Sequence, residues 1–234
     1  MAAASQPAKR ATMARSVLLL VVFSAVWATV HSLLAGRPVK QRVRERFGPQ
    51  TDRWYRAGFV GLTGLTLWPI LPLLLFLPDR LLYAVRGPSR WLMHAGQLVA
   101  AVGIGGAVAQ TGLRRFVGID PLLGKAPEAG ESHQPESLKT TRFYRYVRHP
   151  MFLSSILLIW LTPTMTVNLA TAYFMATLYF SVGTFLEETK LVQTFGEAYR
   201  QYQQQVPRLI PRLGRGAQNA TREELTHEQR RHAE

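Results

Sequence analysis

Long apolar runs separated by basic segments are the dominant pattern of this chain. The last run has 36 residues, which is too long for one helix that crosses about 30 Å of hydrocarbon. The stretch TPTMT interrupts this run, and its Pro163 breaks a helix there. The pattern predicts an all-α, polytopic membrane bundle of about five transmembrane helices, in which the last two form a hairpin. The apolar runs cover residues 16–35, 57–77, 91–113 and 151–186.

The third apolar run contains the glycine-rich stretch GIGGAVA at 103–109. A glycine loop that holds a nucleotide follows a strand and keeps the spacing GxGxxG, and this stretch has neither feature. Small residues four positions apart instead allow two membrane helices to approach closely. We therefore expect this stretch to be a helix-packing surface.

The charge of the chain is strongly positive, with 28 Lys and Arg against 14 Asp and Glu and a net charge of +14. In a soluble protein this charge would indicate nucleic-acid binding. Here the basic residues flank the apolar runs, where anionic lipid and the positive-inside bias favour them, so we expect membrane lipids and no nucleic acid as partners. The chain has no cysteine, which excludes disulfides, zinc–thiolate sites and catalysis through an enzyme thiol.

The distribution of the basic residues predicts an orientation. Segments 35–56, 113–150 and 187–234 carry 7, 7 and 8 of the Lys and Arg, against 3 each in 1–15 and 78–90. Five crossings place the first three segments on one face. That face is therefore predicted to be cytoplasmic, with the N-terminus outside and the chain in a bacterial inner membrane.

Composition also predicts three parts of the chain. Residues 1–113 would form three transmembrane helices with a basic cytoplasmic loop. Residues 114–212 would form a ligand-binding region made of a loop, the helical hairpin and a C-terminal helix, with its site on the cytoplasmic face. Residues 213–234 form a charged tail that we expect to be disordered.

Two dense polar clusters, at 140–152 and 186–211, flank the last apolar run, and the predicted hairpin returns both to the same face. Glu187 and Glu188 beside an apolar helix are costly unless a cation or water matches them. With His149 and several tyrosines, they suit a ligand that has a positive centre and a flat ring. Taken singly, these residues are also typical of interfacial anchors. No metal is assigned, because His149 is the only obvious ligand.

Three motifs in these clusters resemble, in order and spacing, the signature of the integral-membrane S-adenosylmethionine-dependent methyltransferases. They are YRYVRHPMF at 144–152, EE at 187–188 and FGEAYRQYQQQVPRLIP at 195–211. This is the family of isoprenylcysteine carboxyl methyltransferase and the phospholipid N-methyltransferases. HSLLA at 31–35 and TPTMT at 162–166 look closer to its bacterial methanethiol S-methyltransferase branch. NnrU-like membrane proteins share the HSLLA segment and leave a non-enzymatic protein as the alternative of another class.

The resemblance implies S-adenosyl-L-methionine as the cofactor. In the family pattern the first motif lines the adenosine part of this molecule, and the loop before it lies close by. The paired glutamates hold the methionine end. The implied cofactor-binding residues are Leu138, Lys139, Tyr144, His149, Pro150, Met151, Phe152, Glu187, Glu188 and Tyr199.

A small thiol is the implied methyl acceptor, so that methanethiol would become dimethyl sulfide; a lipid or isoprenylated acceptor is the alternative. A thiol must ionise, either because Arg148 or Arg145 lowers its pKa or because His149 acts as a base. The implied catalytic residues are His149, Arg148 and Glu187. The expected substrate residues are His31, Arg145, Tyr202 and Arg208. His31 is included because it lies within the first apolar run, on the predicted cytoplasmic side, and a hydrogen-bonded interfacial histidine is the alternative for it.

The chain also departs from the family pattern. Arg142 and Ser154 stand where the family has glycine, and Phe152 stands where it has tyrosine. Gly183 and Thr184 occupy the place of the arginine that meets the substrate carboxylate in the isoprenylcysteine enzymes. The missing arginine argues against a carboxylate substrate.

Overall fold

Helices form nearly all of the regular structure. The structure is a computed structural model, which describes residues 6–124, 138, 140 and 142–211. The first half contains α1 (Gln6–Leu34), α2 (Arg37–Phe47), α3 (Thr51–Leu67), α4 (Ile70–Phe76), β1 (Leu81–Ala84) and α5 (Pro88–Thr111). The second half contains α6 (Leu113–Val117), α7 (Ile119–Leu122), a 3₁₀ turn (Arg142–Arg145), α8 (Pro150–Trp160), β2 (Thr164–Thr166), α9 (Val167–Phe195) and α10 (Glu197–Gln205).

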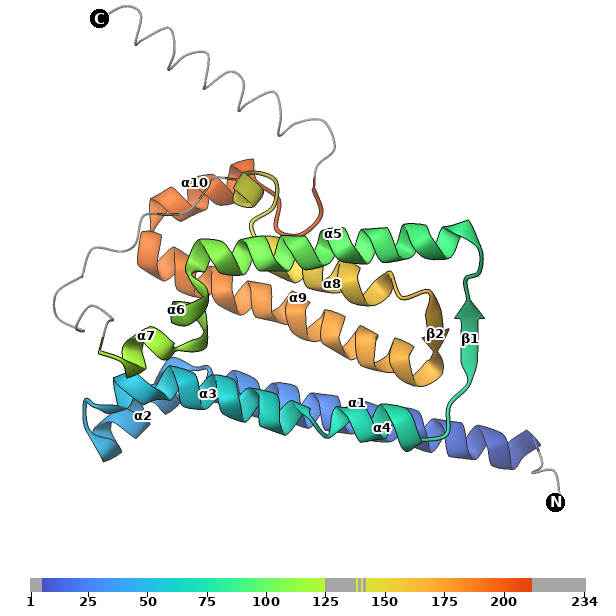
Figure 1. The fold of residues 1–234 in the computed structure, drawn as a ribbon. Coiled ribbons are helices and arrows are strands. Elements are labelled where there is room, and N and C mark those ends of the chain that lie inside the picture. The colour runs from blue at the N-terminus through green and yellow to red at the C-terminus, as the bar shows by residue number, and fades with distance from the viewer. Residues whose placement is uncertain (1–5, 125–137, 139, 141, 212–234) are drawn as a thin grey trace, which may run out of the picture.

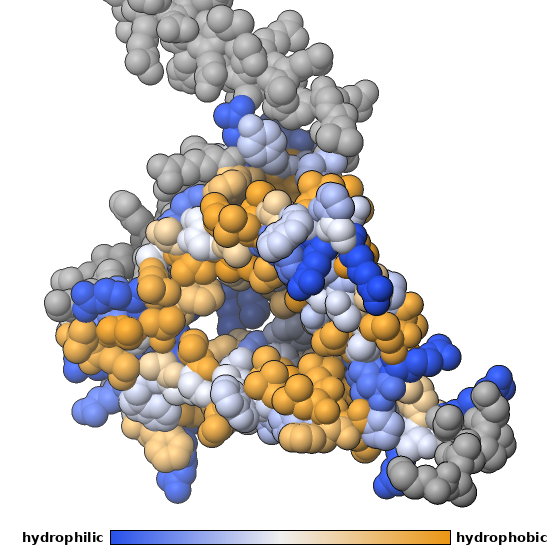
Figure 2. Space-filling view, turned by 45° about the vertical axis from the view of Figure 1, so that its right-hand side comes forward, coloured by the Kyte–Doolittle hydropathy of each residue, from blue (hydrophilic) through white to orange (hydrophobic). Residues whose placement is uncertain are grey.

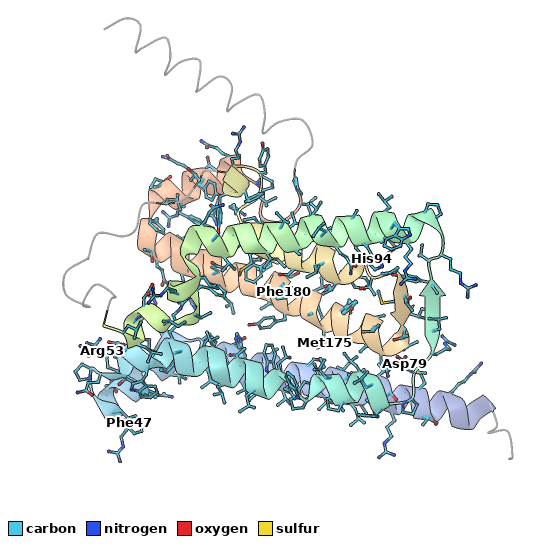
Figure 3. All side chains as sticks on the ribbon, viewed as in Figure 1. Phe47, Arg53, Asp79, His94, Met175 and Phe180 are labelled. Carbon is cyan, nitrogen blue, oxygen red and sulfur yellow. The ribbon has the colours of Figure 1, made fainter. Side chains whose placement is uncertain are left out.

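The long helices form two layers, as Figure 1 shows. One layer contains α1, α3 and α4, and the other contains α5, α8 and α9. The two layers meet where α1 packs against α9. The short helices α2, α6, α7 and α10 lie together at one end, which includes Arg53 and Phe47, whereas Asp79 and His94 lie toward the other end (Figures 1 and 3).

Four of the described helical segments are long and apolar enough to cross a membrane: Arg10–Leu34, Thr51–Phe76, Pro88–Gln110 and Val167–Phe195. Helix α8 has 11 residues, which is about 16 Å at 1.5 Å per residue and only half of the hydrocarbon thickness. Large apolar side chains form patches on the face shown in Figure 2, and Leu75 and Phe76 are more than 70% exposed. These features support a membrane protein, because water does not favour so much exposed apolar surface.

A two-stranded antiparallel sheet corrects the all-α prediction. Leu81 pairs with Thr166 and Ala84 with Thr164, and β1 thereby joins the α4–α5 connection to the α8–α9 connection. Asp79 Oδ1 accepts a hydrogen bond of 3.0 Å from the backbone N–H of Asn168 and fixes the start of α9 beside the sheet. Strands of three and four residues are too short to show the alternating pattern on which a strand prediction depends.

The packing of α5 against α8 confirms the role expected for the small residues of 103–109. A Cβ atom on Gly103 would collide with the side-chain oxygen of Ser154, and one on Gly96 would lie 2.8 Å from Leu161. Ser154 replaces the glycine of the family pattern on α8. The room that it needs comes from the missing side chain of Gly103 on α5.

Candidate active site

The YRYVRHPMF motif leads into α8 and lies beside residues 206–208, which follow α10. The N–H of Arg148 donates to the carbonyl of Pro207 at 2.9 Å, and the N–H of His149 donates to that of Arg208 at 3.2 Å. Pro150 begins α8, where its missing N–H leaves no bond unmade and its fixed φ suits a helix. Backbone hydrogen bonds therefore join the two motifs that flank the last apolar run.

Glu188 is the centre of a buried ionic cluster. Its side chain is 5% exposed. Its Oε1 lies 3.0 Å from Arg148 Nε, a contact whose angle makes it an ion pair and not a hydrogen bond, and its Oε2 accepts from Arg208 Nη2 at 3.2 Å. Gln203 also donates to Oε2, at 3.0 Å. Two cations and an amide therefore compensate the buried carboxylate, as such a charge requires.

His149 bridges the two glutamates. Its Nε2 lies 3.1 Å from Glu188 Oε1, and its Nδ1 lies 3.6 Å from Glu187 Oε2. Burial lowers the pKa of His149, and this effect outweighs the hydrogen bond to Glu188, which acts to raise that pKa. A neutral imidazole next to an acceptor-only carboxylate donates through Nε2 and keeps its lone pair on Nδ1. That lone pair lies on the side of Glu187, whose side chain is 49% exposed.

A cavity of about 330 Å³ opens beside this pair. Side chains of α3, α5, α6, α9 and α10 form its wall together with the YRYVRHPMF motif. Its lining residues are Arg56, Ala107, Val108, Phe116, Leu138, Tyr144, Arg148, His149, Pro150, Met151, Phe152, Glu187, Leu191, Phe195, Tyr199 and Tyr202.

Tyrosines form one side of the cavity. Tyr202 donates its hydroxyl to the carbonyl of Tyr144 at 2.5 Å, and its ring lies 5.8 Å from that of Tyr199. Burial raises the pKa of all three hydroxyls, so they stay neutral near pH 7. The buried hydroxyl of Tyr199 has no hydrogen-bond partner within the described part of the chain. A polar ligand atom would satisfy it.

A series of aromatic rings leads from His149 toward the other layer. Phe152 lies 5.7 Å from His149 and 5.6 Å from Phe180, which lies midway along α9 (Figure 3). Tyr179 follows at 5.9 Å from Phe180 and approaches Nδ1 of His31 to 2.5 Å. His31 is therefore separated from the cavity by this series.

The structure brings most of the expected site residues together. Of the expected set, the cavity wall includes Leu138, Tyr144, Arg148, His149, Pro150, Met151, Phe152, Glu187, Tyr199 and Tyr202. Glu188 lies behind His149, and Lys139 falls outside the described residues. Arg208 pairs with Glu188 and lies 3.6 Å over the ring of Phe185, and Arg145 lies 5.1 Å over Tyr146. Neither of these arginines contributes to the cavity wall.

Six wall residues were not expected from the sequence: Arg56, Ala107, Val108, Phe116, Leu191 and Phe195. Leu191 and Phe195 follow Glu187 by one and two helical turns, so the spacing on α9 contained a signal for them. Arg56 and Phe116 come from segments far away in sequence and gave no local signal.

Comparison with known proteins identifies relatives of a single kind. A methanethiol S-methyltransferase of Pseudomonas deceptionensis is 31% identical over 204 residues, which cover 86% of this chain and 74% of that protein. Methanethiol S-methyltransferase 2 of Bradyrhizobium diazoefficiens is 29% identical over 86% of this chain and 75% of its own. The methanethiol S-methyltransferase of Crocosphaera subtropica is 42% identical over 85 residues, so this match spans only a third of that relative. No family model matches the chain, and no solved structure matches it.

The apolar helices, the cavity and these relatives define an enzyme of one class, a membrane-embedded methyltransferase. Within this class, the chain belongs to the methanethiol S-methyltransferase family. The branch expected from the sequence motifs is thereby confirmed.

Proposed function

We propose that this protein transfers the methyl group of S-adenosyl-L-methionine to methanethiol and produces dimethyl sulfide. The observation that carries the proposal is the cavity beside His149 and Glu187, in a chain whose relatives bear the name of this activity. When bound, S-adenosylmethionine supplies a methyl group on a positively charged sulfur, which a thiolate takes up with loss of both charges.

The cavity has groups that fit such a cofactor. Glu187 presents a half-exposed carboxylate, which suits the ammonium of the methionine part. The unsatisfied hydroxyl of Tyr199 suits a polar atom. Tyr144 and Phe152 offer ring surfaces for a flat base. We therefore assign cofactor binding to these wall residues. Glu188 is a positioning residue, because its contacts hold His149 and two arginines.

His149 is the group best placed to take the proton of the thiol. With Nε2 donating to Glu188, Nδ1 retains a lone pair at the cavity wall and can accept a proton. Arg148 is less suited to stabilise a thiolate, since its guanidinium already pairs with Glu188 and donates to the carbonyl of Gln203. The reaction releases this proton, so His149 must pass it to solvent before the next turnover.

The apolar part of the wall favours the transfer. Leu138, Met151, Phe152, Leu191 and Phe195 exclude water from much of the cavity. Because opposite charges on thiolate and sulfonium disappear in the reaction, a site of low dielectric constant favours the transition state over the separated ions.

We further propose the membrane arrangement predicted from the basic residues. The cavity is lined by residues of α6 and α10, which lie at the same end of the bundle as α2 (Figure 1). This end would face the cytoplasm of a bacterial inner membrane, with the N-terminus outside. In this arrangement α8 and α9 form a hairpin in which the short α8 enters the bilayer beside α5. Residues 114–212 would then be the cofactor-binding region, completed by wall residues of α3 and α5.

The test is an assay of the purified full-length protein in lipid nanodiscs with methyl-labelled S-adenosylmethionine. Labelled dimethyl sulfide formed from methanethiol is the expected product. If the protein methylates a lipid or an isoprenylated thiol but not methanethiol, the methyl acceptor is the alternative one. If calorimetry detects no binding of S-adenosylhomocysteine, and Glu187→Ala behaves like the wild type, the protein is instead a non-enzymatic NnrU-like membrane protein.

A further inference from the structure

Arg56 is a charged residue of the cavity wall that belongs to neither motif cluster. It lies in the second turn of α3, in the layer opposite α8 and α9. Its Nε donates to the carbonyl of Phe116 at 2.9 Å, and its Cζ lies 5.9 Å from the ring of that residue. Since Phe116 also lines the cavity, these contacts hold the guanidinium at the wall.

Gly118 brings the segment after α5 into this position. Its φ is +85°, and a Cβ atom there would lie 2.7 Å from the backbone nitrogen of Ala57. Glycine therefore permits both the left-handed turn and the close contact with α3. This contact places Phe116 next to Arg56, so the position of the guanidinium is determined by the fold.

The wall has an unequal distribution of charge. Arg148 is ion-paired with buried Glu188, which it shares with Arg208, and Glu187 contributes a half-exposed negative charge. Arg56 adds a positive charge contributed by the other layer. A ligand with one anionic and one cationic group at the same end would match Arg56 and Glu187 together.

We infer that Arg56 binds the α-carboxylate of S-adenosylmethionine, while Glu187 binds its α-ammonium. The inference rests on the proposed function, which supplies the identity of the ligand. The planar guanidinium suits a carboxylate, because two of its N–H groups match the two oxygens. The methionine end of the cofactor would then be held between the two layers of the bundle.

The experiment compares two ligands that differ only in the carboxylate. These are S-adenosylhomocysteine and S-adenosyl-3-thiopropylamine, each titrated calorimetrically into the full-length protein in nanodiscs. The wild type is expected to bind the first more tightly. Arg56→Gln should weaken binding of the first by about 10- to 100-fold, the range for a hydrogen bond to a charged group, and leave the second within about 2-fold.

Two further variants distinguish a specific contact of Arg56 with the carboxylate from a general effect of positive charge or of misfolding. Arg56→Lys keeps the charge and should retain part of the preference for the carboxylate. Arg53→Gln removes an equal charge one turn earlier on α3, from an exposed position outside the cavity wall, and should bind both ligands like the wild type.

An equal loss of affinity for both ligands in Arg56→Gln, or a loss for neither, would overturn the assignment of Arg56. A wild type that binds both ligands equally would overturn it as well, whatever the variants do. A wild type that binds neither ligand would overturn the proposed function itself and the assignment with it.

Discussion

His149 Nε2 and Glu188 Oε1 lie 3.1 Å apart within a buried cluster, whereas neighbouring Glu187 faces the cavity with a half-exposed side chain. Successive residues of a helix point about 100° apart, so two adjacent glutamates have different surroundings. The pair is thus divided between a buried, ion-paired carboxylate and one that faces the cavity.

Replacement of Glu188 should mainly affect stability. Glu188→Gln leaves Arg148 and His149 buried without a carboxylate, and we expect the free energy of unfolding to fall by about 3 kcal/mol, the cost of breaking a buried ion pair. Denaturant unfolding in detergent micelles measures this change. Glu187→Gln is the matched control: it should change the free energy of unfolding little and abolish most S-adenosylhomocysteine binding. If Glu187→Gln lowers the stability and Glu188→Gln abolishes binding instead, Glu187 is the structural carboxylate and Glu188 the one that binds the ligand.

Protonation of His149 should make the fold sensitive to acid. Because burial lowers its pKa from about 6.5, the unfolded chain takes up the proton at a higher pH than the folded protein does. Stability is therefore complete above about pH 6.5 and decreases as pH falls toward the lowered pKa. Unfolding followed from about pH 7.5 to 5.5 should show this decrease, and His149→Gln should reduce it. An unchanged slope in His149→Gln would contradict the prediction.

The two buried tyrosines should respond differently to loss of the hydroxyl. Tyr202→Phe removes the hydrogen bond to the Tyr144 carbonyl and should lower stability by about 1 kcal/mol. Tyr199→Phe removes a hydroxyl without a partner in the described structure, so the ligand-free protein should be as stable or more stable. Its affinity for S-adenosylhomocysteine should fall, as calorimetry would detect. Unchanged affinity in Tyr199→Phe would show that this hydroxyl does not contact the ligand.

The close approach of α5 and α8 should depend on Gly103. Gly103→Ala introduces a collision with Ser154 and should destabilise the protein by about 1–3 kcal/mol, as overpacking does. Adding Ser154→Gly should restore most of the loss. Gly105→Ala meets nothing within 4 Å and serves as the control on the same helix. Thermal unfolding of the four proteins, the wild type included, gives the comparison, and a double variant no better than Gly103→Ala would contradict the proposed contact.

The contact of Gly118 with α3 should be needed for the cavity. Gly118→Ala adds both an unfavourable positive φ and a collision with Ala57, and it should destabilise the protein and weaken S-adenosylhomocysteine binding. Gly124 also has a positive φ, of 66°, but open space around it. Gly124→Ala should therefore show only the backbone cost. Equal effects of both variants on binding would mean that the collision is irrelevant.

The fold was predictable where the sequence has a long-range pattern. The apolar runs matched the long helices, and the break at 162–166 matched the start of α9. About twenty consecutive apolar residues favour a membrane helix more strongly than the local helix propensity of any single residue can oppose it. The amphipathic helix α2 was missed, although Val39, Val43 and Phe47 repeat at four-residue spacing there. The sheet was missed because its pairing is decided between β1 and β2, which are distant in sequence.

The site was predictable where motifs were local. Tyr144, His149 and Glu187 were expected on their motifs, and all three line the cavity. The difference between Glu187 and Glu188 depends on the rotation of α9, which a dipeptide does not reveal. Arg56 reaches the wall only because Gly118 allows another segment to pack against α3, so its place depends on tertiary structure.

The backbone bonds from Arg148 and His149 to Pro207 and Arg208 also determine when the site can exist. Pro207 and Arg208, whose carbonyls accept these two bonds, follow both α8 and α9 in the chain. Tyr199 and Tyr202 of the cavity wall also follow α9, so the wall is complete only when this last segment has packed against the start of α8. A ligand of this cavity therefore stabilises the complete fold by binding to it, and it finds no complete wall on a chain whose last segment has not packed.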